Sequence, residues 1–309
     1  MSKNIIGLDL LGGDLPPADL LKEIASHLDS AHLALFGTSD TITAYNHLDL
    51  AHLSVEFIPV EEVIELDEDP LSAIRQKKNA SVHIGMRLLN EGHISAYLGI
   101  GNTGALLAAA KIHLPALPSH PRPALLAMLP TQKKALAVLD VGANLSAKPE
   151  HFIEMAHMGI AFQKTRGIEK PKVALLNIGS EELKGHKELR EAYKKLKQHF
   201  PENFVGNIEG RDVFKGAIDV LVTEGFTGNI FLKTAEGVSQ FILNRIESLL
   251  PSNEAITQNL DTDTFPGALL LGLNHIVVKC HSYASGLPIA LAIKATEKLL
   301  DGHLIENLH

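Results

Sequence analysis

The sequence has 309 residues, of which 45% are hydrophobic and 21% charged. This balance excludes a disordered chain, because ample apolar surface is present to offset the entropy of ordering. The formal net charge of −8 argues against nucleic-acid binding, since neutralising phosphates needs a basic surface. The single cysteine fits a reducing, cytoplasmic compartment, and no segment resembles a membrane span of about 20 apolar residues.

The first half of the chain alternates short apolar runs with runs of helical periodicity. We predict strands at 4–9, 32–36, 53–59 and 95–99, and helices at 18–30, 39–46, 70–90 and 104–114. Asp69 and Pro70 have the character of an N-cap followed by proline in the first helical position, which sets the start of the third helix.

The second half begins with two apolar runs, 124–130 and 135–140, separated by only four residues. This spacing predicts an antiparallel hairpin. Beyond it we predict helices at 149–162, 188–199, 227–250 and 287–300, and strands at 172–178, 204–208, 219–223 and 276–279. The polar segment 251–266 lacks apolar periodicity and is predicted to be a surface excursion.

Alternation of strands and helices over the whole length predicts an α/β fold with a mainly parallel sheet covered by helices on both faces. We expect a single catalytic domain over residues 1–309. Two lobes around a cleft are the alternative, since the length also suits two modest domains.

Polar turns that contain glycine follow most of the predicted strands, where open α/β sheets bind their ligands. The turn from Gly101 to Gly104 leads into a helix N-terminus, whose unpaired amides and partial positive charge suit an anion. Thr227, Gly228 and Asn229 have the same arrangement. A tight strand-to-helix turn and an N-cap threonine are the respective structural alternatives.

Isolated cations in or beside these turns are candidates to meet phosphate oxygens, namely Lys184, Arg211, Lys279 and His281. The alternative is that each is a solvated surface charge. The same choice applies to the basic segment 75–79, which either forms a solvated helix face or binds an anion or a partner protein.

Several chemistries find no support in the sequence. There is no Ser-His-Asp order or nucleophile elbow, no dinucleotide fingerprint, and no pair of histidines closer than five residues apart. We therefore predict neither a cofactor nor a metal site. Cys280 lies between Lys279 and His281, which could activate a thiol, but a small buried residue at a strand end is the favoured interpretation.

Read in order, the turns and their flanks resemble the phosphate acyltransferase (PlsX) family of bacterial phospholipid synthesis, from about Asn4 to Ile293. The most specific blocks are AIRQKKNAS (73–81), GNTGALLAAA (101–110), RPAL (122–125), LDVGAN (139–144), KPEHFIEMAHMG (148–159), LLNIGSEELKG (175–185), FVGNIEGRD (204–212) and GFTGNIFLKTAEG (225–237).

The resemblance implies transfer of a long fatty acyl chain from acyl carrier protein to inorganic phosphate, giving acyl phosphate for phospholipid synthesis. It implies a Rossmann-like three-layer α/β/α fold, similar to phosphotransacetylases and to isocitrate and isopropylmalate dehydrogenases. It also implies a cytoplasmic homodimer with peripheral membrane contact. Because phosphate is itself the nucleophile, the protein needs only to bind a dianion, orient it and stabilise the oxyanion.

Roles for individual residues follow from the resemblance. Lys184, Asn229, Lys279 and His281 are expected to be catalytic, the last two through charge stabilisation or proton transfer to the leaving thiolate. The acidic carrier protein is expected to meet Arg75, Lys77 and Lys78. The residues expected to bind phosphate or the acyl phosphate are Asp9, Gly12, Gly13, Gly101, Asn102, Thr103, Gly104, Asn144, Thr227 and Gly228.

The chain departs from the usual family pattern at some of these turns, at Leu15, Ile100, Ser146, Glu224 and 282–284. Two alternative functions therefore stay open at this point. One is a short-chain phosphotransacylase that uses acyl-CoA, and the other is a weakly active homologue that serves as a scaffold in lipid synthesis.

Overall fold

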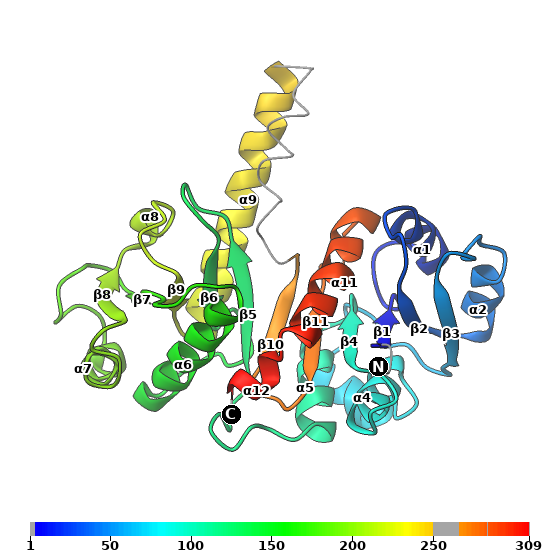
Figure 1. Cartoon of the computed structure of the whole chain (residues 1–309), viewed down its shortest axis with the longest axis horizontal. Helices are drawn as coiled ribbons and strands as arrows, with labels where there is room; N and C mark the ends of the chain where they lie inside the picture. Colours follow the sequence, from blue (N-terminus) through cyan, green and yellow to red (C-terminus); the bar gives the residue numbers. More distant parts are fainter. Residues whose placement is uncertain (1–3, 250–265, 283, 309) are drawn as a thin grey trace. The chain divides into compact units, whose positions relative to one another are not determined.

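A computed structural model describes residues 4–249, 266–282 and 284–308 and divides the chain into two compact units (Figure 1). The first unit holds Met1–Pro123 together with Phe265–Asn307, and the second holds Ala124–Thr264. The excursion expected over 251–266 lies outside the described residues, apart from Pro266.

The first unit is built on strands in the order β3-β2-β1-β4-β11-β10. All neighbours are parallel except β10 and β11, which form an antiparallel pair. The chain builds the sheet outward from β1 through β2 to β3 and then reverses to β4, so a topological switch point lies between β1 and β4. The strands are β1 (Ile6–Asp9), β2 (His32–Gly37), β3 (Ser54–Pro59), β4 (Ala96–Gly99), β10 (Ala268–Leu271) and β11 (Ile276–Lys279).

Helices of the first unit form two packed groups, one joining α1 to α11 and α2, the other joining α5 to α3 and α4. Apolar residues at helical spacing explain the packing, as in α1, whose Leu20, Leu21 and Ile24 are buried. The helices are α1 (Pro17–Ser26), α2 (Ser39–Tyr45), α3 (Pro70–Gln76), α4 (Ser81–Asn90), α5 (Thr103–His113), α11 (Gly286–Asp301) and α12 (Leu304–Leu308).

The single helix expected over 70–90 is wrong, because the chain breaks it into α3 and α4. Lys77 leaves the helical region, with φ −95° and ψ 76°. Two glutamates then hold the break, since Asn79 donates its amide to Glu61 (2.9 Å) and its backbone N–H to Glu62 (2.8 Å). Both glutamates precede Pro70 in the sequence, so the apolar periodicity of residues 70–90 does not indicate the break.

The second unit has strands in the order β5-β6-β9-β7-β8. The predicted hairpin is confirmed, since β5 and β6 are antiparallel, and the remaining neighbours are parallel. Its strands are β5 (Ala124–Leu129), β6 (Leu136–Leu139), β7 (Val173–Leu176), β8 (Phe204–Ile208) and β9 (Val220–Val222). Its helices are α6 (Pro149–Thr165), α7 (Lys187–His199), α8 (Gly210–Val213) and α9 (Gly225–Leu249).

The expected α/β class with a mainly parallel sheet is confirmed, and its strands are largely buried except for β3 and β8. Prediction missed β10, α8 and α12. Within the part of the chain that the structure describes, none of the helices combines the length and the apolar character needed to cross a bilayer.

Candidate active site

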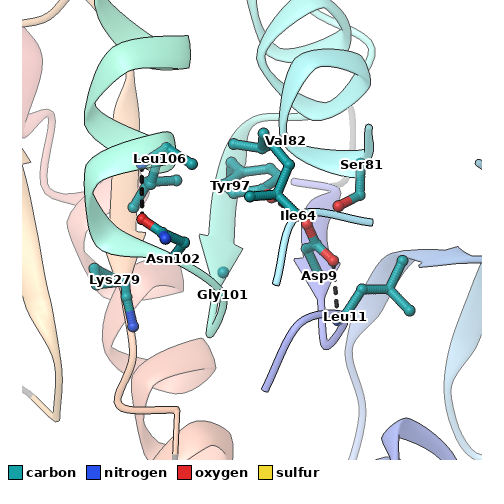
Figure 2. A pocket seen from close by; sticks show the side chains of 12 residues that line it. Asp9, Leu11, Ile64, Ser81, Val82, Tyr97, Gly101, Asn102, Leu106 and Lys279 are labelled. Carbon is teal, nitrogen blue, oxygen red and sulfur yellow. Dashed lines mark hydrogen bonds between the residues drawn. The ribbon is translucent and has the colours of Figure 1, made fainter. Parts of the chain in front are cut away.

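A pocket lies at the switch point between β1 and β4 in the first unit. This is where open α/β sheets bind ligands. Three neighbouring strands contribute to its lining at their carboxyl ends: Asp9 ends β1, Gly101 follows β4, and Lys279 ends β11 (Figure 2).

The Gly101–Gly104 turn leads from β4 into α5, as predicted. Asn102 caps the helix by accepting the Ala105 N–H at 3.1 Å, and its amide donates to the carbonyls of Leu66 (3.2 Å) and Glu68 (3.1 Å). The side chain of Asn102 therefore fixes the shape of the turn. The groups available to an anion are the first backbone amides of α5, which have no partners within a helix.

Lys279 ends β11 and points its ammonium group toward the same turn. Nζ donates to the Ile100 carbonyl at 3.0 Å and to the Cys280 carbonyl, which brings a positive charge to the pocket wall. Cys280 is buried, and burial raises the pKa of its thiol to about 12. The favoured interpretation of a buried, inert cysteine is thus supported. His281 follows it and is half-buried.

Asp9 lies at the floor of the pocket as a buried acid. Its carboxylate accepts the Leu11 N–H at 3.1 Å and the Tyr97 hydroxyl at 2.5 Å, and Ser81 is a further hydrogen-bond partner. Burial raises the pKa of Asp9 despite these bonds, and burial together with the Asp9 charge raises the pKa of Tyr97 well above its ordinary value. Asp9 is thus held by partners from its own chain, and its expected role toward phosphate stays a prediction.

Glycines of the first turn serve packing. Gly12 has a φ of +66°, and a Cβ there would lie 2.5 Å from the Ile64 carbonyl oxygen. A Cβ on Gly13 would lie 2.3 Å from the end of the Ile100 side chain. Ile100, one of the departures from the family pattern, is accommodated by the missing side chain of Gly13.

A second constellation occupies the carboxyl ends of the strands of the second unit. Asp140 follows β6, and its carboxylate organises the turn to Asn144: the N–H groups of Gly142 and Ala143 bond Oδ1 at 3.0 and 2.8 Å. Asn144 donates its backbone N–H and its amide to Oδ2, at 2.8 and 3.0 Å. Asn144 is thereby a fixed part of the turn, and its carbonyl accepts the Gly225 N–H at 2.9 Å.

The start of α9 packs directly on this turn. A Cβ on Gly228 would lie 1.9 Å from the Asp140 carbonyl oxygen, so only glycine fits. Thr227 donates its hydroxyl to the Glu224 carboxylate at 3.0 Å. Asn229, the fifth residue of the helix, is exposed beside Gly142. At the start of α9 the Thr227 hydroxyl and the amides of Gly225 and Phe226 are therefore already bonded within the chain.

Lys184 lies in the turn that follows β7, the strand next to β9. Asn177 closes this turn by donating its amide to the Lys184 carbonyl at 3.1 Å. The Lys184 ammonium is 3.7 Å from a Glu181 carboxylate oxygen, and 46% of the side chain is exposed. Lys184 and Asn229 therefore follow neighbouring strands at one edge of the second unit.

The three basic residues expected to meet a carrier protein lie at the end of α3. Arg75 and Lys78 are exposed, and Lys78 also donates to the Ile74 carbonyl at 3.1 Å. Lys77 is engaged within the unit, where Nζ bonds the Val63 carbonyl at 2.7 Å and the Glu68 carboxylate at 2.5 Å. The surface charges of this segment are therefore Arg75 and Lys78.

The predicted residues thus fall into separate sets, each at the carboxyl ends of the strands of its own unit. The first unit brings together Asp9, Gly12, Gly13, Gly101, Asn102, Thr103, Gly104, Lys279 and His281, and the second brings together Asn144, Lys184, Thr227, Gly228 and Asn229. Sequence analysis missed Tyr97 and Ser81, the partners of Asp9. Tyr97 lies within the buried strand β4, and Ser81 is the first residue of α4, so neither position marks its hydroxyl as a partner of Asp9 in the sequence.

Residues 5–307 match the family described as fatty acid synthesis protein. A phosphate acyltransferase of Chlamydia caviae is 38% identical over 98% of this chain and 97% of its own length. A phosphate acyltransferase of Pseudomonas fluorescens is 37% identical over 100% of this chain and 98% of its own.

Two solved structures share the fold of this chain, and their sequence identity is too low to show more than the fold. A phosphotransacetylase from Streptococcus pyogenes is 16% identical, with a TM-score of 0.67 over 99% of this chain and 95% of its own. A 4-hydroxythreonine-4-phosphate dehydrogenase from Klebsiella pneumoniae is also 16% identical, with a TM-score of 0.56 over 98% and 100%. The expected similarity to phosphotransacetylase and dehydrogenase folds is confirmed.

Proposed function

The chain belongs to the fatty acid synthesis protein family and is a phosphate acyltransferase, and on that premise we propose that it moves a long acyl chain from acyl carrier protein to inorganic phosphate. A phosphate oxygen attacks the thioester carbonyl, a C–O bond forms, and the C–S bond breaks. The products are an acyl phosphate and the thiol of the carrier, which takes up a proton.

One observation carries the proposal: the switch-point pocket joins a helix N-terminus to an ammonium group. The first amides of α5 offer hydrogen bonds to phosphate or to the oxyanion, and Lys279 supplies positive charge on the same wall. Asn102 keeps the amides in place through its cap. The chemistry needs no protein nucleophile, which agrees with the burial of Cys280 and the raised pKa of its thiol.

In the second unit we assign Asn229 and Lys184 to the reacting group. Both are exposed at the ends of neighbouring strands, and the hydrogen bonds of Asp140 and Asn177 hold the turns beside them. An exposed amide and an exposed ammonium are suited to orient phosphate and to stabilise negative charge. His281 is the proposed proton donor to the leaving thiolate.

The test is phosphate-dependent formation of acyl phosphate from hexadecanoyl carrier protein, with the product trapped by hydroxylamine. We expect turnover that saturates with phosphate and falls at least about a hundredfold in Lys184→Ala. Lys187→Ala, whose side chain is 77% exposed on α7, is the matched control and should keep full activity. Full activity of Lys184→Ala would remove this residue from the mechanism.

Donor competition separates the alternatives. A preference for acetyl-CoA over hexadecanoyl carrier protein would indicate a short-chain phosphotransacylase. Partner binding without turnover, and without stabilisation by phosphate, would indicate a scaffold. We expect Arg75→Glu to raise KM for the acidic carrier donor and to leave KM for an acyl-CoA unchanged, because the charge reversal acts on the carrier alone.

The proposal extends to assembly and location: a homodimer in the cytoplasm with peripheral membrane contact. The exposed apolar residues Val238, Phe241 and Ile242 on the distal part of α9 support a packing face. Sedimentation with and without anionic vesicles tests the dimer and the membrane contact. A monomer that does not sediment with the vesicles would refute both.

A further inference from the structure

Exposed apolar side chains gather at the carboxyl edge of the second unit. Leu145 follows β6, Ile178 and Leu183 follow β7, and Phe226 and Ile230 begin α9 after β9. Between 53% and 82% of each residue is exposed. Single exposed apolar residues are ordinary, but several large ones on one edge mark a binding surface.

The three connections that carry them are neighbours. The strand order β6-β9-β7 places their carboxyl ends side by side. The Phe226 N–H bonds the Leu145 carbonyl at 3.3 Å, which ties two of the connections together. The third is a closed turn whose ends are joined by the bond between Asn177 and Lys184. We call this set of five side chains the apolar rim.

The rim is interleaved with the polar residues assigned to the reaction. Leu183 precedes Lys184, and Ile230 follows Asn229. Leu145 follows Asn144, which belongs to the turn held by Asp140. Each proposed polar group thus has a large aliphatic neighbour on the same rigid connection. A ligand that suits this pattern has a polar reacting head joined directly to an apolar tail.

We propose that the apolar rim binds the acyl chain of the donor next to the thioester and makes the enzyme selective for long chains. This inference rests on the proposed function, in which the donor is a fatty acyl thioester. Methylenes of the chain leave water as they cover the rim, so the gain grows with chain length until the rim is covered. The rim therefore acts as a determinant of specificity and takes no part in bond making.

The experiment compares hexadecanoyl and butanoyl carrier protein as donors for the double variant Ile178→Ser, Leu183→Ser. We expect kcat/KM for the long donor to fall about tenfold or more, mainly through KM, and kcat/KM for the short donor to change less than about twofold. The matched control is Ile112→Ser, because Ile112 is 60% exposed in α5 of the first unit and lies outside the rim.

Three results of this experiment would overturn the inference. An equal loss for both donors shows that the rim does not sense the chain. Unchanged values for both donors show that it does not bind the chain. An equal loss accompanied by a change in sedimentation shows that the rim is an interface between subunits.

A binding measurement separates this inference from the proposed function. Wild-type protein without phosphate-dependent turnover on either donor contradicts the proposed function. A fluorescent long-chain fatty acid then still tests the rim: the inference requires that it bind wild type and the Ile112 control alike and the double variant at least about tenfold more weakly. Equal binding to all three proteins overturns it.

Discussion

Asp9 and Asp140 hold corresponding places in the two units. Each follows or ends a buried strand, is nearly inaccessible, and precedes a turn containing glycine. The carboxylate of Asp140 accepts five N–H groups, four from the backbone and one from an amide. Asp9 accepts one backbone N–H and is otherwise held by the hydroxyls of Tyr97 and Ser81.

The two sites differ in whether their donor groups can also accept a hydrogen bond. An N–H group can only donate, whereas a hydroxyl can turn and accept. The turn of the second unit is therefore built around an obligatory acceptor, and the pocket floor of the first unit tolerates a neutral group. The same local sequence pattern thus gives an aspartate that orders a turn in the second unit and an aspartate that lines a pocket in the first.

Asp140→Asn should have the largest effect, because the turn of the second unit depends on this acceptor. The new NH₂ group faces N–H donors that cannot turn, so buried donors lose their acceptor at a cost of about 1–3 kcal/mol each. We expect a loss of about 4 kcal/mol in the free energy of unfolding, measured by urea denaturation followed by circular dichroism. A loss as small as that of Asp9→Asn would show that the two carboxylates are equivalent.

Gly228→Ala tests how closely α9 depends on the Asp140 turn. Its Cβ would lie 1.9 Å from the Asp140 carbonyl oxygen, and displacing backbone costs about 3 kcal/mol. Gly101→Ala is the control in the first unit, where the Cβ would lie 3.2 Å from the Leu11 carbonyl oxygen. We expect Gly101→Ala to lose less than about 1 kcal/mol and to raise KM for phosphate, because the added methyl group hinders a ligand that approaches the backbone.

The comparison also shows what the sequence allows. The α/β class, the hairpin and the turns at strand ends follow from local periodicity and glycine placement, and the structure bears them out. The break at Lys77 and the partners of Asp9 depend on side chains distant in the sequence, as with Tyr97, which lies 88 residues from Asp9. Sequence pattern gives the positions of the turns, and long-range contacts decide which of their groups are engaged.

Asp9→Asn should have a smaller effect that depends on pH. Burial raises the native pKa of Asp9 above its ordinary value of 3.8, so the folded protein binds the proton more tightly than the unfolded chain does. Stability contributed by protonated Asp9 is complete below that value and is lost as pH rises through the native pKa. We expect the variant to gain on wild type as pH increases from about 4, with a difference within about 1 kcal/mol at neutral pH. A constant difference in urea midpoint across this range would show that Asp9 does not titrate with a raised pKa.

His113 adds a titration of opposite sign to the unit that contains Asp9. Its Nε2 lies 2.8 Å from Nδ1 of His83, whose Nε2 donates to the Ile74 carbonyl at 2.9 Å. Because a carbonyl only accepts, neutral His83 carries its proton on Nε2, and His113 donates across the pair. Burial, followed by the charges of His83, Arg87 and Lys78, lowers the pKa of His113 below 6.5.

The stability that neutral His113 contributes is complete above pH 6.5 and is lost as pH falls through the lowered native pKa. His113→Gln keeps a donor for His83 and removes the titration. We expect the free energy of unfolding of the variant, measured by urea denaturation, to fall less than that of wild type between pH 7 and pH 5. The difference should stay below about 1 kcal/mol because the ring is partly solvated. In the double variant with Asp9→Asn, the pH dependence of stability should come from the remaining titratable groups. The two effects should add, because the two sites have separate partners. Parallel curves of unfolding free energy against pH for wild type and His113→Gln would contradict this prediction. They would mean that the contacts of the histidine pair among α3, α4 and α5 do not depend on pH.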